Sequence, residues 1–179
     1  MVKKSIMNLT TNKILKFMNI MAWLIFIGLA IETGTVLLSF TISFINPIVA
    51  KNLYMGLNFY ELMQYNIWQY VLAVCFIVAL LLMKAFVAYL VIKTLSKVNI
   101  ERPFTTDVVK KMEIVSYLLF GIWLVCIMFT FHSMTYRLAP VIEKQTVSGE
   151  FLLFAALIYV FSQIFKRGIE LQNESDFTV

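Results

Sequence analysis

A single lysine inside a long apolar run constrains this chain more than any other residue. The run from Tyr70 to Leu95 reads YVLAVCFIVALLLMKAFVAYLVIKTL, and Lys84 stands in its second half. About twenty mostly apolar residues span the hydrocarbon layer of a membrane as a helix that rises about 1.5 Å per residue. A charge inside that layer costs roughly 2.5–3.5 kcal/mol on insertion scales. A spanning helix of this composition therefore needs a partner for Lys84.

The partner that the sequence offers is Glu32, the one acid within another apolar run, Met21–Ile45. Counted from an inner helix end near Ile20, Glu32 lies about 18 Å deep at about 1.5 Å per residue. Lys84, counted in the same way from Lys93, lies about 13 Å deep. A lysine side chain can reach across the difference, whereas the headgroups are about twice as far away. We therefore expect Glu32 and Lys84 to form an intramembrane pair.

The composition places the whole chain in a membrane. Of its 179 residues, 61% are hydrophobic and 14% are charged, and the mean hydropathy is +0.85. Soluble domains carry about 25% charged residues. The segments between the apolar runs are too short and too hydrophobic to fold separately, so no soluble catalytic domain is expected. The sequence predicts one all-α domain over residues 1–179, an integral membrane four-helix bundle with spans at approximately 19–45, 70–95, 114–136 and 147–167.

The basic residues predict the direction of threading. Eleven of the 15 lysines and arginines lie in residues 1–19, 93–113 and 166–167, and three lie beyond the opposite span ends. Because lysine and arginine concentrate in cytoplasmic segments, both termini are expected in the cytoplasm, with a cytoplasmic loop over 93–113 and a cytoplasmic tail over 168–179. This threading also explains the net charge of +5 without direct nucleic-acid binding, since the basic residues flank apolar runs.

The first span and the residues before it are predicted to form one helix with one face against protein. Thr10 or Thr11 can cap a helix that runs straight on into the membrane. Lys3 and Lys4 resemble the start of a signal peptide, but the following run is too long and has no clear cleavage site, so a retained span is expected. Small and hydroxyl residues recur at every third or fourth position, as close helix packing in lipid requires. This stripe consists of Gly28, Glu32, Thr35, Ser39 and Ser43.

The outer segment 46–69 is predicted to lie at the membrane interface. Asn46-Pro47 ends the first span. Tyr and Trp favour the headgroup level because the ring is apolar while its polar atom stays wet. An aromatic belt explains the segment, and a surface that binds an external peptide or lipid is the alternative. Its apolar residues include Leu53, Tyr54, Met55, Phe59, Tyr60, Met63, Tyr65 and Trp68.

Two polar segments on the expected cytoplasmic side form the predicted partner-binding surface. In the loop, the run Arg102, Pro103, Phe104 breaks the helix. Acidic side chains in the tail can attract a basic surface of a soluble cytoplasmic protein. A solvated tail without a partner is the alternative. The acidic residues are Glu170, Glu174 and Asp176.

The helix that contains the third span, 114–136, is expected to start at Thr105 or Thr106, whose side chain caps it, and His132 is expected near the outer end of the span. A lone histidine there is more often an interfacial residue than a metal ligand, and no second histidine accompanies it. No metal site and no cofactor are expected. Cys75 and Cys126 differ in expected depth by roughly 7 Å, which favours two small core residues over a disulfide.

Two short motifs carry a resemblance to a known family. They are NIERPF at residues 99–104, a Pro-Phe element before the third span, and the ending FKRGIELQNESDFTV at residues 165–179. Together with the number and spacing of the spans, they resemble a family of bacterial four-span membrane proteins called domain of unknown function 2975. The resemblance implies a protein of the bacterial inner membrane, encoded beside small helix-turn-helix regulators, and hence a membrane partner for a transcription factor. It implies no catalytic residues.

The sequence favours a non-enzymatic protein that binds a soluble cytoplasmic regulator through the loop and the tail. A small transporter or proton-linked subunit that uses Glu32 and Lys84 is one alternative, because ionisable residues inside a membrane are functional suspects. Transport folds usually show repeats or broken spans, which this chain lacks. Immunity or resistance to a membrane-active peptide through the outer segment is another alternative. An enzyme is not expected, because no HExxH, GxSxG or paired aspartates lie in any span.

Overall fold

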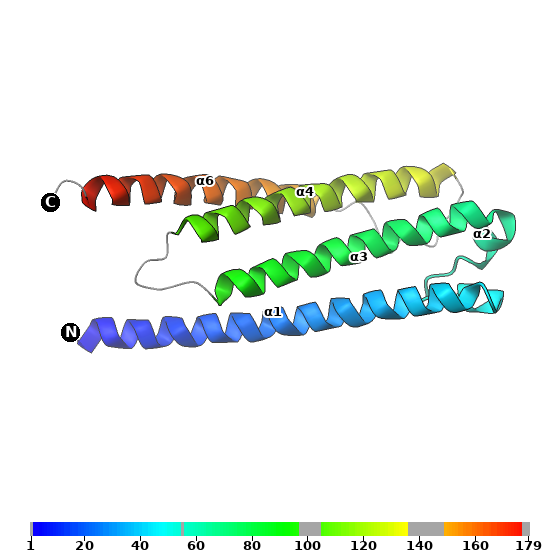
Figure 1. Ribbon diagram of the computed structural model, residues 1–179, viewed down its shortest axis with the longest axis horizontal. Coiled ribbons are helices and arrows are strands. Elements are labelled where there is room, and N and C mark those ends of the chain that lie inside the picture. Colours follow the sequence, from blue (N-terminus) through cyan, green and yellow to red (C-terminus); the bar gives the residue numbers. More distant parts are fainter. Residues whose placement is uncertain (1, 55, 97–104, 136–148, 177–179) are drawn as a thin grey trace. The chain divides into compact units, whose positions relative to one another are not determined.

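The computed structural model is all-helical over the residues that it describes, which are 2–54, 56–96, 105–135 and 149–176, with 2–12, 134, 135, 175 and 176 described by their backbone alone. The elements in chain order are α1 (Val2–Ser43), the 3-10 helix η1 (Pro47–Lys51), α2 (Tyr60–Tyr65), α3 (Ile67–Leu95), α4 (Thr106–Thr135) and α6 (Glu150–Asp176) (Figure 1). Within these ranges, four helical stretches are long and apolar enough to cross a membrane: Lys13–Ser43, Ile67–Leu95, Thr106–Ser133 and Glu150–Glu174. The predicted fold class, all-α with four apolar helices that can span a membrane, is confirmed.

The surfaces of these helices suit lipid rather than water. Large apolar side chains are exposed on each of the four, as with Leu38 on α1, Leu82 on α3, Phe131 on α4 and Leu153 on α6. Soluble proteins rarely expose contiguous apolar surface on this scale, whereas lipid tails are as apolar as a leucine side chain. The chain is therefore a multi-pass membrane protein by helix length and composition. The direction of threading stays a prediction.

The chain divides into two compact units. One comprises Met1–Phe26, Phe86–Phe120 and Glu150–Val179, and the other comprises Ile27–Ala85 and Gly121–Gly149. We call the first the α6 unit and the second the cap unit, because η1 and α2 belong to the second. Helices α1, α3 and α4 each contribute one part to each unit. The single membrane domain over 1–179 stays a prediction.

The helix starts agree with the expected capping signals at one place and differ at another. The side chain of Thr105 accepts a hydrogen bond from Val108 N at 3.4 Å, just ahead of α4, so the expected cap is confirmed. The expected cap at Thr10 or Thr11 is wrong, because α1 begins at Val2. No proline or glycine interrupts the first nineteen residues, so nothing in the local sequence stops the helix from propagating through both threonines.

The segment that follows α1 is folded, and we call residues 44–54 and 56–66 the cap. Its buried apolar side chains form one cluster with residues of α1, α3 and α4 from the same unit, such as Val36, Ala73 and Phe129. A loose interfacial connection would not bury side chains in this way, so the cap is a structural element of its own unit. The buried cap residues are Ala50, Leu53, Leu57, Phe59 and Leu62.

Four asparagines shape the cap by accepting hydrogen bonds from nearby backbone N–H groups. Asparagine side chains readily make such local bonds, which is why they favour turns and helix starts. The asparagines stand just ahead of η1, α2 and α3 and in the turn after η1, where Gly56 has a φ of 86° that glycine adopts without strain. The Oδ1 contacts are Asn46 to Ile48 N (3.2 Å), Asn52 to Gly56 N (2.9 Å), Asn58 to Tyr60 N (3.1 Å) and Asn66 to Trp68 N (2.9 Å).

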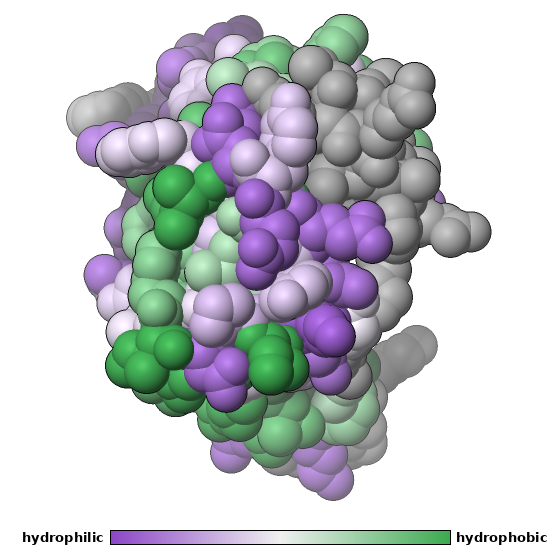
Figure 2. All heavy atoms as spheres, turned by 90° about the vertical axis from the view of Figure 1, so that its right-hand side faces the viewer, coloured by the Kyte–Doolittle hydropathy of each residue, from purple (hydrophilic) through white to green (hydrophobic). Residues whose placement is uncertain are grey.

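The aromatic residues expected at the interface divide into a buried and an exposed group. Phe59 is buried, and its ring centroid lies 6.4 Å from that of Tyr70. Tyr65 and Trp68 are 77% and 78% exposed. Figure 2 looks onto the end that carries α2, where hydrophilic and hydrophobic residues both reach the surface. Phe59 is therefore a core residue of the cap, and the position at the headgroup level stays a prediction for Tyr65 and Trp68.

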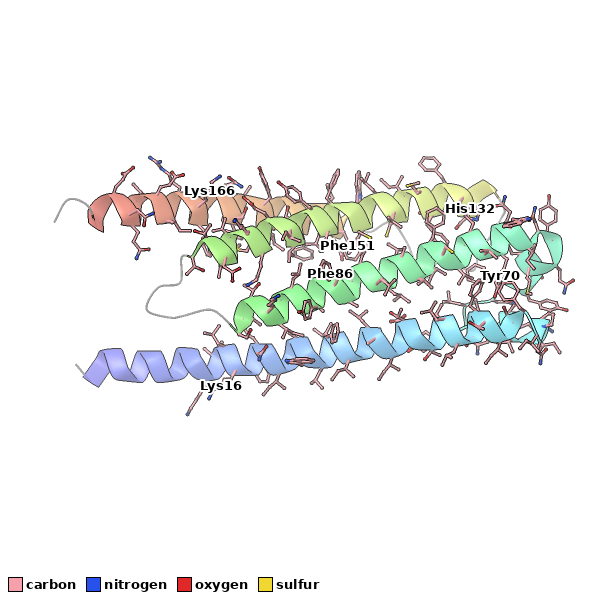
Figure 3. All side chains as sticks on the ribbon, viewed as in Figure 1. Lys16, Tyr70, Phe86, His132, Phe151 and Lys166 are labelled. Carbon is pink, nitrogen blue, oxygen red and sulfur yellow. The ribbon has the colours of Figure 1, made fainter. Side chains whose placement is uncertain are left out.

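A buried hydrogen bond joins α1 to α3 beneath the cap. The hydroxyl oxygens of Ser43 and Tyr70 are 2.7 Å apart, and both residues are fully buried. Ser43 Oγ also donates to the carbonyl oxygen of Phe40 at 2.6 Å. Because the one hydroxyl hydrogen of Ser43 is used in that bond, Tyr70 is the donor to Ser43. Figure 3 labels Tyr70, which lies between α1 and α3.

This order of donors predicts an asymmetry between the two mutations. Ser43→Ala leaves the buried Tyr70 hydroxyl without its acceptor and should cost about 1–3 kcal/mol. Tyr70→Phe leaves Ser43 bonded to Phe40 and should cost only about 0.5–1.5 kcal/mol. Thermal melting in mild detergent measures both, with Thr41→Val as the control, because the exposed Thr41 hydroxyl bonds only to the Leu37 carbonyl of its own helix. A larger loss for Tyr70→Phe than for Ser43→Ala would contradict the assigned direction.

In the α6 unit, two contacts fix how α6 lies along α4. Glu113 Oε1 accepts a hydrogen bond from Gln163 Nε2 at 3.1 Å. One turn further along α4, the ring of Tyr117 lies 6.2 Å from that of Tyr159. From the first contact to the second, the residue number rises by four on α4 and falls by four on α6. The two helices are therefore antiparallel in this unit.

Candidate functional site

The two residues of the predicted intramembrane pair lie in the same compact unit. Glu32 is on the part of α1 and Lys84 on the part of α3 that belong to the cap unit, and both are half-buried. A half-buried charge between apolar helices still needs compensation, because lipid offers none. The ion pair itself stays a prediction.

The small-residue stripe on α1 is covered by protein at one end only. Ser43 is buried under the cap, as predicted. Gly28 is exposed, and apart from its own stretch of helix no described atom lies within 4 Å of the place where a Cβ would stand, so the prediction is wrong there. The reason is that other parts of the protein cover little of α1. In its most apolar stretch 6% of the residues are buried, compared with 39% in that of α3. Between these ends, Thr35 donates to the Ile31 carbonyl of its own helix at 2.9 Å.

A double-mutant cycle tests the pair. Lys84→Met alone should destabilise the protein by up to about 3–5 kcal/mol, because it leaves the half-buried Glu32 carboxylate without its partner. Glu32→Gln together with Lys84→Met should recover most of the loss. Detergent melting of the wild type, both single variants and the double variant gives the coupling energy. Simply additive losses would show that the residues do not interact, and would favour the transporter reading of Glu32.

The acidic residues predicted to bind a partner lie on α6, which continues unbroken to Asp176. The helix therefore does not end at residue 167, where the sequence predicted that the span 147–167 would give way to the tail 168–179. Arg167 Nη1 donates to Glu170 Oε2 at 2.7 Å, and the two side chains are 66% and 48% exposed. Glu174 is exposed one turn further on. The side chain of Asp176 lies outside the described residues.

The end of α6 carries an unfavourable arrangement of charge. Its last two turns hold three acidic residues, and its last turn holds no basic residue. The carbonyl end of a helix bears partial negative charge, so each acid there costs about 0.3–1 kcal/mol when exposed. Arg167 attracts both Glu170 and Glu174, but water screens ion pairs that are this exposed, so the offset is small. Cationic groups from another molecule would add to it.

The loop half of the predicted surface is described only at its edges. Arg102, Pro103 and Phe104 lie outside the described residues. At the start of α4, the Lys111 ammonium contacts the Asp107 carboxylate, and this lysine is buried although its partner is 52% exposed. The spacing of an acid four residues before a lysine on one helix was the available sequence signal for this ion pair.

Within the described ranges, no three His, Cys, Asp or Glu side chains lie close enough together to hold a metal ion. His132, which Figure 3 labels, packs its ring 6.0 Å from that of Phe76 in the cap unit. An aromatic neighbour at this distance gives the imidazole a packing role at the end of α4.

Comparison with known proteins identifies the family. Residues 46–179 match the family described as Protein of unknown function (DUF2975). The chain belongs to this family. The match confirms the resemblance carried by the two motifs. It covers the cap from residue 46 onward, together with α3, α4 and α6, and so includes Lys84 and the predicted partner-binding residues. Glu32 precedes it. No curated protein and no solved structure matches the chain.

Proposed function

We propose that this chain is a non-enzymatic protein of the bacterial inner membrane that holds a soluble cytoplasmic protein at the membrane. The contact surface is the acidic end of α6 together with the loop over 93–113. The partner has a basic surface, as a small helix-turn-helix regulator does. The observation that carries the proposal is the acidic helix end, with Glu170 and Glu174 exposed beyond the last basic residue of α6.

The geometry of this end suits a basic partner. Glu170 and Glu174 are four residues apart on one helix, so their carboxylates lie on the same side. Such a pair can compete with DNA phosphates for the lysines and arginines of a regulator. The segment is already helical, so binding does not have to order its backbone.

The order of charges along α6 supports the same orientation. Lys166 and Arg167 follow the apolar run, where basic residues meet the headgroups of a cytoplasmic leaflet. The acidic residues follow about 5–14 Å further along the helix axis at 1.5 Å per residue. They are thereby held clear of the anionic lipid surface and within reach of a soluble protein.

Cysteine labelling tests the threading that the proposal requires. In a background with Cys75→Ala and Cys126→Ala, Glu61→Cys in the cap should react with an impermeant maleimide on intact cells. Thr106→Cys at the start of α4 should react only after the cells are permeabilised. Both positions are exposed, so a difference in labelling reports the side of the membrane. The reverse pattern would place the end of α6 outside the cytoplasm and overturn the proposal.

A charge-neutral variant of the α6 end tests the partner contact. Glu170→Gln with Glu174→Gln should weaken retention of the partner about 5- to 30-fold, since two exposed ion pairs contribute about 1–2 kcal/mol together. Affinity purification from native membranes with quantitative mass spectrometry measures the retained protein. Truncation after Gln172 should also reduce retention while leaving membrane insertion intact.

The matched control is Glu150→Gln, which neutralises an exposed acid at the opposite end of the same helix. It should leave retention unchanged. If the double variant and the control retain every co-purifying soluble protein equally, the α6 end does not hold the partner.

A further inference from the structure

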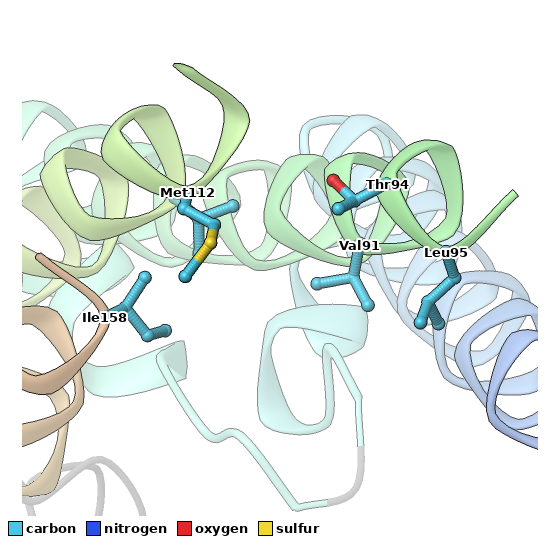
Figure 4. Close-up of a pocket in the computed structure, with 6 residues that line it drawn as sticks. Val91, Thr94, Leu95, Met112 and Ile158 are labelled. Carbon is cyan, nitrogen blue, oxygen red and sulfur yellow. The ribbon is translucent and has the colours of Figure 1, made fainter. Parts of the chain in front are cut away.

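An apolar cavity lies between α3, α4 and α6 within the α6 unit. Its volume is about 190 Å³. Figure 4 shows Met112 of α4 and Ile158 of α6 on one side, across from the end of α3. The six lining residues are Val91, Thr94 and Leu95 of α3, Met112 and Val115 of α4, and Ile158 of α6.

The chemistry of the lining favours an apolar guest over water. Thr94 carries the one hydroxyl among the lining residues, and its Oγ1 donates to the Leu90 carbonyl of its own helix at 2.7 Å. A buried water needs two to four polar partners, which these six side chains do not provide. An empty space of this size would forfeit dispersion contacts along its whole lining. The cavity is therefore suited to hydrocarbon.

The size and position of the cavity match part of a lipid tail. An apolar cavity of about 150 Å³ accepts a guest as large as benzene, so this cavity can hold several methylene groups. The lining residues Val91 and Met112 are half-buried, which leaves the cavity accessible from the helix surface. Ile114 and Leu157, which directly precede the lining residues Val115 and Ile158 in the sequence, are exposed apolar residues of candidate spans. The cavity is thus continuous with the surface that lipid covers.

Basic residues near the cavity mark the expected level of the lipid headgroup. Lys93 follows Val91 by two positions on α3, and Lys110 precedes Met112 by two positions on α4. Lys93 stands between the lining residues Val91 and Thr94 on α3, and along the helix axes each of the two lysines lies within about 8 Å of the lining residues of its own helix at 1.5 Å per residue. A phosphate at the lysine level would place the first methylene groups of its chains at the depth of the cavity.

We propose that this cavity binds one acyl chain of a membrane phospholipid. The chain fills the space between α3, α4 and α6, and the headgroup stays at the level of the lysines. The bound lipid is then a structural component of the α6 unit, distinct from the lipid that exchanges freely around the spans. The site does not depend on the partner proposed for the end of α6.

Native mass spectrometry of the protein purified in mild detergent tests the proposal by counting bound phospholipid. Val115→Phe and Ile158→Phe fill the cavity and should reduce the lipid-bound fraction about tenfold. Val115→Ala enlarges it and should keep the lipid. Leu153→Phe is the matched control, because Leu153 is exposed on α6 outside the cavity lining. Equal retention by the filled variants and the control would overturn the proposal.

A second measurement on the wild type covers the case in which the filled variants do not fold. The protein is placed in vesicles that contain a phospholipid with a photoreactive diazirine on the upper part of one acyl chain. Crosslinks should concentrate on peptides that carry Met112, Val115 and Ile158. Crosslinks spread evenly over all exposed apolar residues of the spans would show that lipid only surrounds the protein, and would overturn the proposal.

Discussion

The absence of water from the hydrocarbon layer is the constraint on which the rest of this structure depends. Every backbone N–H and C=O in that layer has to be bonded within the protein, and a continuous helix achieves this within a single segment. The same constraint acts on side chains. Threonine hydroxyls on three spans donate to the carbonyl four residues earlier in their own helix, so they do not need a hydrogen-bond acceptor on a neighbouring helix. These residues are Thr33, Thr35, Thr41, Thr94 and Thr130.

Outside the long apolar helices, side chains rather than the helix backbone satisfy the polar groups. In the cap, asparagine side chains bond the backbone N–H groups that no long helix satisfies. Beneath it, the buried Tyr70 hydroxyl donates to Ser43, and Ser43 in turn donates to the Phe40 carbonyl of its own helix. The last turn of α6 holds no basic residue, and the acids near its end add to the partial negative charge of the helix terminus. Acidic residues at this helix end cost stability, and residues that cost stability at a surface often serve a function. We therefore place the proposed partner contact at the end of α6.

The fold class could be predicted from the chain because it rests on local properties. Apolar runs long enough to cross a bilayer admit few structures besides helices, so four spans follow from hydropathy alone. The start of α4 at Thr105 was equally local, since a cap depends on a few neighbouring residues. The prediction at Thr10 or Thr11 was wrong for a related reason. A capping residue permits a helix to start, but it does not compel one where the preceding residues are helical too.

The sequence by itself determined that the chain enters a membrane, where its apolar helices lie, and which acids crowd the end of α6, because these properties depend on residues close together along the chain. Only the tertiary structure decided which of them are covered. Phe59 and Trp68 are both aromatic residues of one short outer segment, yet one is buried and the other is 78% exposed. Ser43 and Gly28 belong to one stripe, yet only Ser43 meets protein. Burial depends on which distant segments pack against a residue, and periodicity along one helix carries no information about the helix beside it.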